Sequence, residues 1–189
     1  MKSADADMRR NRCKLHGLAR VRVDPERGSD GASSTTRRMP RVSIEYDHAS
    51  GDGRGGRYGR FDTLFGMRRA DLGPSGLYNA FGRTNFISPG LRIEAVPDKR
   101  TDLMATLRPI WLAAREDSFS TTGVRDAGGS SGSFAGTQID GRIRHQLTKA
   151  LRLEVDAVLL AKGRFLREAP NAPPGRWTKY VSFNATASF

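Results

Sequence analysis

The chain has 189 residues, of which 37% are hydrophobic and 28% charged, and its formal net charge is +12. This length suits one domain of ordinary size, and the absence of a run of 18 apolar residues excludes a transmembrane helix. A membrane-spanning β-barrel is not excluded, because its strands need only about 9–11 residues with apolar side chains at alternate positions. The single cysteine, Cys13, excludes a disulfide framework and a cysteine-based metal site.

The N-terminal segment, residues 1–39, is predicted to be a disordered basic tail. Half of the net positive charge lies before residue 42, in a stretch rich in Ser, Gly, Asp and Arg and poor in periodic apolar residues. No apolar stretch is followed there by a small-residue cleavage site, so no export signal is recognised in this chain. Two interpretations stay open: the start of a longer gene product is missing, or the chain is an intact basic cytoplasmic protein.

Residues 40–189 are predicted to form an antiparallel meander of about six strands, because apolar and polar side chains alternate over six segments. The segments are 41–50, 85–96, 102–114, 136–147, 150–162 and 177–189. Pro109 lies inside the third segment and cannot donate an amide to the ladder, so a β-bulge is expected there.

The connections between these segments are long, short, long, short and medium in turn. They span residues 51–84, 97–101, 115–135, 148–149 and 163–176. Outer-membrane barrels alternate long extracellular loops with short periplasmic turns, and their closing strand commonly ends on an aromatic residue, as Phe189 does here. The fold class predicted is therefore all-β, the C-terminal segment of an outer-membrane β-barrel, which by itself would be an open, curved sheet.

The charges of the last short hairpin predict its register. Pairing Arg144 with Glu154 places Arg142 opposite Asp156, so both cross-strand pairs have opposite charge. A slip by two residues would instead place Arg144 opposite Arg152. We expect the first register.

Seven segments of residues 40–189 form a further pattern. They read YDHASGD (46–52), GRFDTLF (59–65), NFISPGLRIEAVP (85–97), LAAREDSF (112–119), GTQIDGRIRHQL (136–147), KGRFL (162–166) and YVSFNATASF (180–189). In this order they resemble the C-terminal part of the alginate export family of outer-membrane porins. The resemblance implies a single-chain barrel of about eighteen strands in a Gram-negative outer membrane. It also implies transport of an anionic polysaccharide or small solutes, an arginine-lined constriction, and long loops folded into or over the pore. The N-terminal barrel strands are then missing from this chain, and they and the outer-membrane lipid are its expected partners.

Charged residues at alternate strand positions are the candidates for contact with a solute in the lumen. They are Arg92, Arg108, Arg142, Arg144 and Arg152, with Glu94, Asp140, Glu154 and Asp156 between them. Arginine suits a carboxylated sugar because its planar guanidinium binds carboxylate through two parallel hydrogen bonds. The alternative is that these arginines only balance neighbouring carboxylates along the barrel wall.

Two other classes of function stay open: a small soluble ligand-binding β-barrel, and a basic nucleic-acid-binding protein with an RGG-type segment at residues 54–60. A row of apolar residues distinguishes them, because it would face lipid in a porin but would face inward around a ligand in a soluble barrel. The row consists of Leu103, Leu107, Trp111, Ile139, Ile143, Leu151, Leu153, Val155 and Leu159. No catalytic, metal-binding or cofactor-binding motif is recognised, and no enzymatic activity is expected.

Overall fold

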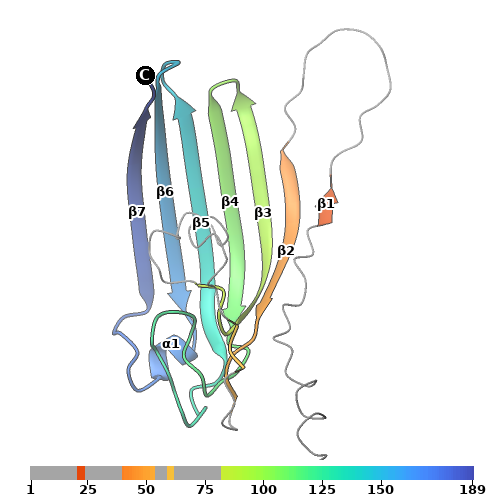
Figure 1. Cartoon of the computed structure of the whole chain (residues 1–189), viewed down its shortest axis with the longest axis vertical. Helices are drawn as coiled ribbons and strands as arrows, with labels where there is room; N and C mark the ends of the chain where they lie inside the picture. Colours follow the sequence, from red (N-terminus) through yellow and green to blue (C-terminus); the bar gives the residue numbers. More distant parts are fainter. Residues whose placement is uncertain (1–20, 24–39, 54–58, 62–81) are drawn as a thin grey trace, which may run out of the picture.

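The computed structural model describes residues 21–23, 40–53, 59–61 and 82–189. These residues form one antiparallel sheet in which each strand pairs with the next along the chain, from β1 to β7 (Figure 1). The strands are β1 Val21–Val23, β2 Arg41–Ala49, β3 Phe86–Asp98, β4 Thr101–Trp111, β5 Phe134–Gln146, β6 Leu151–Lys162 and β7 Trp177–Ala187. The all-β antiparallel meander predicted from the sequence is confirmed, and β2 to β7 are its six expected strands.

The short strand β1 was not expected. It lies within the segment predicted to be a disordered tail, and it pairs with Val42 to Ile44 of β2. The other residues of that predicted tail lie outside the described part of the chain. Among the described residues, no helix has the length and apolar composition of a membrane span.

The connections separate by length onto the two ends of the sheet. The turns from β3 to β4 and from β5 to β6 lie at the same end as the C-terminus (Figure 1). The longer connections from β4 to β5 and from β6 to β7 lie at the opposite end, as do the described residues that directly follow β2 and precede β3, and the last connection contains the short helix α1, Phe165–Glu168. We call these the short-turn end and the long-loop end. The predicted alternation of loop lengths is thus present.

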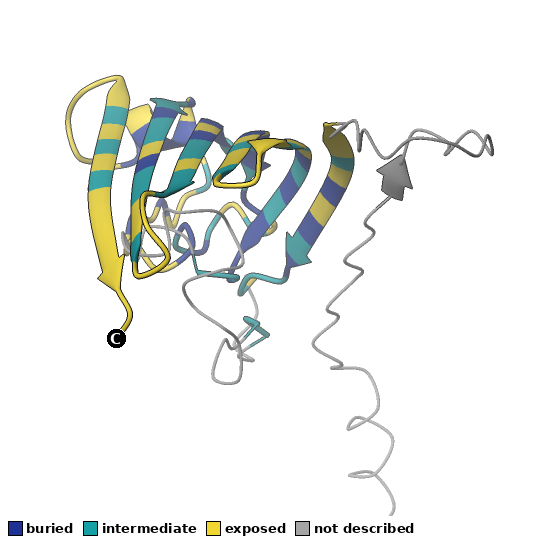
Figure 2. Cartoon of the chain, turned by 90° about the horizontal axis from the view of Figure 1, so that it is seen from above, coloured by how far each residue is buried: buried dark blue, intermediate teal, exposed yellow. Residues whose placement is uncertain are grey.

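The sheet is curved and open (Figure 2). Its two faces differ in character. Side chains on one face, which we call the outer face, are apolar and exposed, including Ile44, Leu91, Leu107, Ile139, Ile143 and Phe183. On the opposite, inner face, polar and charged side chains are buried, including Glu45, Asp47, Arg108, Gln138, Asp140 and Asp156. This distribution is the reverse of that in a soluble sheet, where the apolar face is the covered one.

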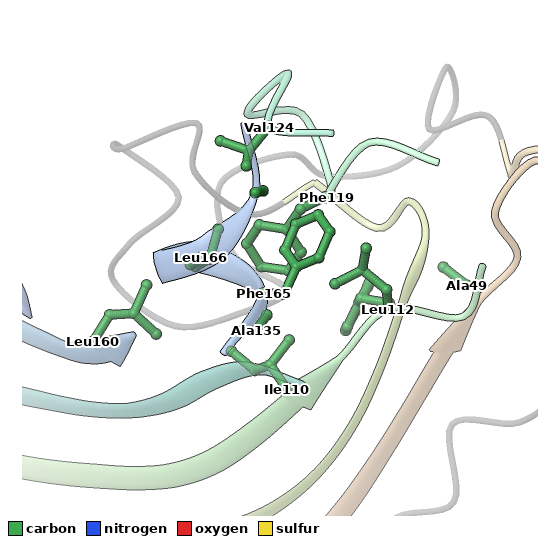
Figure 3. Close-up of a cluster of buried hydrophobic side chains, with 11 residues drawn as sticks. Ala49, Ile110, Leu112, Phe119, Val124, Ala135, Leu160, Phe165 and Leu166 are labelled. Atoms are coloured by element: carbon green, nitrogen blue, oxygen red, sulfur yellow. The ribbon is translucent and has the colours of Figure 1, made fainter. Parts of the chain in front are cut away.

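A small apolar core lies on the inner face at the long-loop end (Figure 3). Ile110, Ala135 and Leu160 contribute to it from the strands, and Phe119 and Phe165 from the loops. The rings of Phe119 and Phe165 are tilted, with centroids 6.4 Å apart. Full burial of a phenylalanine side chain stabilises a fold by roughly 1.5–3 kcal/mol. This core therefore holds the long loops against the inner face.

The ladder is irregular near Pro109, although not at the position predicted for a bulge. The pairing of β3 with β4 is interrupted between Ile87–Trp111 and Leu91–Leu107, where Pro89 and Pro109 occupy the two strands. The shift of register against β5 falls between Ile110 and Trp111. Since neither proline has an amide N–H to donate, the interruption lies where the ladder has the fewest donors.

Candidate functional site

The nine charged residues predicted to face the lumen share the inner face. The pleat of each strand sends alternate side chains to opposite faces, and these nine occupy the same side as the buried residues Glu45 and Gln138. They extend over four strands, β3 to β6, from the long-loop end to the short-turn end. They are Arg92 and Glu94 on β3, Arg108 on β4, Asp140, Arg142 and Arg144 on β5, and Arg152, Glu154 and Asp156 on β6.

Arg108 is the most buried of these arginines, with a side chain only 4% exposed. Its Nη2 lies 3.1 Å from Glu45 Oε2 and its Nη1 lies 3.3 Å from Asp47 Oδ2. Both carboxylates belong to β2, so the guanidinium reaches across β3 to the second strand away. Asp47 also lies 3.9 Å from Nη2 of Arg83, in the loop that precedes β3.

Gly90 of β3 provides the space for this crossing. A Cβ atom at Gly90 would lie 3.6 Å from Glu45 Cβ and 3.9 Å from Arg108 Cβ, so a methyl group would already be in contact with both. A longer side chain there would occupy the space that the Arg108 guanidinium crosses. Glu45 and Asp47 were not among the predicted site residues; their only signal in the sequence is that they alternate with apolar residues on β2.

The β5–β6 hairpin has the register predicted from its charges. Arg142 pairs with Asp156 and Arg144 with Glu154 across the ladder. Arg142 Nε donates a hydrogen bond to Asp156 Oδ1 at 2.8 Å, and Arg144 Nε donates one to Glu154. The second oxygen of Asp156 accepts weaker hydrogen bonds from Ser182 and Asn184 of β7, at 3.3 and 3.5 Å.

Arg92 and Glu94 form a further ion pair on β3. Arg92 Nη2 donates a hydrogen bond to Glu94 Oε1, and its Nη1 lies 3.8 Å from Glu45 Oε1. Glu94 also receives a hydrogen bond from Arg41 of β2, at 3.4 Å. Arg92 is therefore placed between two carboxylates.

Asp140 and Arg152 are the two predicted residues without an ion pair of their own among the described residues. Asp140 is fully buried; its Oδ1 accepts a hydrogen bond from Gln138 Nε2 at 2.6 Å, and its Oδ2 has no hydrogen-bond partner in the described chain. Arg152 is exposed, and its neighbours across the two ladders are the uncharged Gln146 and Thr186. Four of the five predicted arginines are thus held by carboxylates, and Arg152 is the exception.

The long loops are joined over the inner face by a network centred on Asn85. This residue is fully buried and has a positive φ of 50°, a conformation that asparagine adopts more readily than most residues. Its Nδ2 donates to the carbonyl oxygens of Ala114 and Ser118, both at 3.0 Å, and its Oδ1 accepts from the Ala114 amide at 2.7 Å. A Cβ atom at Gly51 would lie 2.0 Å from Asn85 Oδ1, so only glycine fits there.

A second group of contacts in this network surrounds Asp117. Its Oδ2 accepts a hydrogen bond from the Asp52 amide at 2.8 Å, and its Oδ1 lies 3.5 Å from Arg60 Nη1. Arg60 Nη1 also donates to Ser118 Oγ at 2.7 Å. The loop that follows β2 is thereby attached to the loop that follows β4. Within the described ranges, no three His, Cys, Asp or Glu residues are grouped so that they could hold a metal ion.

The apolar row that distinguishes the functional classes lies on the outer face. Five of its members, Leu103, Leu107, Ile139, Ile143 and Leu153, are exposed, and the other four are half-buried. An exposed apolar side, a charged inner side and strands of 9 to 13 residues from β2 to β7 are the features of part of the wall of a β-barrel porin.

The family follows from the sequence of the chain. The sequence model of the family described as Alginate export matches residues 34–178, and the chain belongs to this family. This confirms the resemblance noted above. The family is one of outer-membrane porins, a transport family and not a family of enzymes, and membership supports a porin-like role in alginate export. A comparison with curated proteins gives no match.

Proposed function

We propose that residues 40–189 form part of the wall of an outer-membrane channel through which alginate, an anionic polysaccharide, crosses. In this arrangement the inner face lines the lumen and the outer face contacts lipid. The observation that carries the proposal is the reversed polarity of the sheet: aliphatic side chains such as Ile139 and Ile143 are exposed, while Asp140 and Asp156 are buried.

The ion pairs of the inner face favour the passage of a charged solute over its tight binding. A channel must bind its solute strongly enough for entry and weakly enough for release. Arg92, Arg108, Arg142 and Arg144 contact carboxylates of the wall, so each can offer an approaching uronate only part of its hydrogen-bonding capacity. A wall of paired charges would therefore hold water and guide a charged polymer without retaining it.

The soluble ligand-binding barrel loses support because its apolar row would have to face inward, whereas the row lies on the outer face. The RGG-type interpretation depends on residues 54–60, of which 54–58 lie outside the described part of the chain. Membership of a transport family favours the channel over both alternatives.

Conductance across a planar lipid bilayer tests the proposal. Because the open sheet needs further strands to enclose a lumen, the chain is refolded in detergent together with N-terminal barrel strands from another member of the family and is then added to the bilayer, where stepwise current increases are expected. An alginate oligosaccharide should reduce that current reversibly, and a neutral oligosaccharide of the same length should reduce it much less. An absence of current steps from the completed barrel, or equal block by both sugars, would contradict the proposed function.

A further inference from the structure

The inner face at the short-turn end differs from the rest of the wall in the state of its arginines. Deep in the sheet, Arg108 is 4% exposed and contacts two carboxylates. Close to the short turns, the Arg144 side chain is 36% exposed, and Arg152 is exposed and free of ion pairs among the described residues. The arginine side chains of the inner face are thus more exposed to solvent toward the short-turn end.

We propose that Arg152, assisted by Arg144, forms a carboxylate-binding site at the short-turn mouth of the inner face, where a uronate residue of the polysaccharide is first bound. This inference rests on the proposed function. It assigns the recognition of the polymer to the mouth, and it assigns to the deeper arginines the role of structural counter-ions.

The surroundings of Arg152 explain why it is available. Its strand β6 has a neighbour on each side in the sheet, so its cross-strand partners are fixed as Gln146 on β5 and Thr186 on β7. Neither carries a charge. The Gln146 side chain is itself engaged, because its Nε2 donates to the Thr148 carbonyl oxygen in the short turn at 2.7 Å.

The nearest carboxylate along β6 is already in use. Glu154 lies two residues from Arg152 on the same face, but it accepts a hydrogen bond from Arg144 and lies 3.9 Å from Arg142 Nε. At the end of β3, beside the other short turn, Asp98 accepts a hydrogen bond from the Arg100 amide at 2.6 Å. Glu154 is therefore held by other partners. Asp102 of β4 lies opposite Arg144 on the same face, but no ion pair joins it to either arginine among the described residues.

Arg144 stands close enough to act with Arg152. It is opposite Glu154, and Arg152 is opposite Gln146, so the two arginines are diagonal neighbours on one face, about 7–8 Å apart at their Cα atoms. The short turns beside these arginines carry two further positively charged residues, Arg100 and Lys149. The ligand that fits such a site is a polymer with carboxylates on successive sugars, because two guanidinium groups can bind two of its residues.

Titration of the full chain in detergent with an alginate oligosaccharide tests the site. Arg152→Gln should weaken binding about two- to fivefold, as expected for one exposed charge pair, and Arg152→Lys should weaken it less because the positive charge remains. The matched control is Arg176→Gln, which removes the same charge from an exposed arginine at the long-loop end. Because Arg152 is exposed and unpaired among the described residues, its replacement should leave the fold intact.

The outcomes separate this site from the proposed function. Binding by the unaltered chain that Arg152→Gln weakens and Arg176→Gln does not would support the site. Binding that both variants weaken equally, or that neither weakens, would overturn the site and leave the channel function standing. No binding by the unaltered chain, together with no current in the bilayer, would overturn both.

Discussion

Arg142 and Asp156 face each other across β5 and β6 with Nε 2.8 Å from Oδ1, and the Asp156 side chain is only 2% exposed. The contact joins two neighbouring strands of the charged inner face, and Asp156 also receives hydrogen bonds from β7. One buried carboxylate therefore connects three consecutive strands.

Replacing Asp156 with alanine should destabilise the sheet, because the partly buried Arg142 would keep its charge without its closest counter-ion. We expect a loss of roughly 2–3 kcal/mol in the free energy of unfolding, somewhat below the cost for a fully buried pair. Urea unfolding of the refolded chain in detergent, followed by tryptophan fluorescence, measures this. The double variant Arg142→Asp with Asp156→Arg should recover part of the loss, and no recovery would argue against a direct pair.

Gly90→Leu should displace Arg108 from Glu45 and Asp47, because the leucine would fill the space over β3 that the guanidinium crosses. Overpacking of this kind costs about 1–3 kcal/mol, and the disturbed ion pairs add to that cost. The control is Gly141→Leu, since a Cβ atom at Gly141 would meet nothing within 4 Å. Urea unfolding of both variants should show a large loss for the first and little change for the second. Equal losses would mean that the space over Gly90 is not needed for the crossing.

Asn85 is expected to hold the loop between β4 and β5 over the inner face. Asn85→Ala removes three hydrogen bonds and places a residue without asparagine's tolerance at a positive φ. Trypsin should then cut faster after Arg115 and Arg125 in that loop, as mass spectrometry of the digest would show. Asn85→Gly accepts the backbone conformation but also loses the hydrogen bonds. If Asn85→Gly were as resistant as the unaltered chain, the hydrogen bonds would not be what holds the loop.

Acid should loosen a second point in the same loop, at Asp126. Its carboxylate accepts hydrogen bonds from the Ser131 amide at 2.7 Å and from the Gly128 amide and the Ser130 hydroxyl at 3.0 Å, which lowers the pKa of Asp126 well below its usual range. A depressed folded-state pKa means that the stabilisation is complete above the ordinary aspartate value of about 3.9 and is lost as the pH falls through the lower folded-state value.

The amide chemical shift of Ser131, followed by NMR from pH 6 downward, reports this titration. Its midpoint should lie below pH 4, and Asp126→Asn should abolish the titration. A midpoint at or above 4 would show that the hydrogen bonds do not favour the ionised form. The loop should therefore keep its structure throughout the pH range in which the outer-membrane environment is neutral or mildly acidic.

The sequence predicted the features that depend on local periodicity. Alternation located the six long strands, and the charges of Arg142, Arg144, Glu154 and Asp156 were enough to predict the register of β5 against β6. It did not predict that Arg108 would reach Glu45 and Asp47, because that contact crosses an intervening strand and depends on the missing side chain of Gly90. The role of Asn85 was also missed, since its positive φ and its partners at Ala114 and Ser118 are set by the packing of distant loops.

The polarity of the sheet determines what its two tryptophans contact in a membrane. Trp177 at the start of β7 is 56% exposed on the outer face, and Trp111 at the end of β4 shares that face and contacts Phe134, with ring centroids 5.4 Å apart. In vesicles that contain brominated lipid, bromine quenches tryptophans that touch the acyl chains. We expect quenching of the Trp177 signal in a Trp111→Phe background.

The control carries Trp111→Phe, Trp177→Phe and Tyr180→Trp, which moves the single indole to an inner-face position three residues along β7. That indole should be quenched far less, because the inner face contacts water in a channel. Equal quenching at positions 177 and 180 would mean that lipid reaches both faces, and the assignment of the inner face to a lumen would then be wrong.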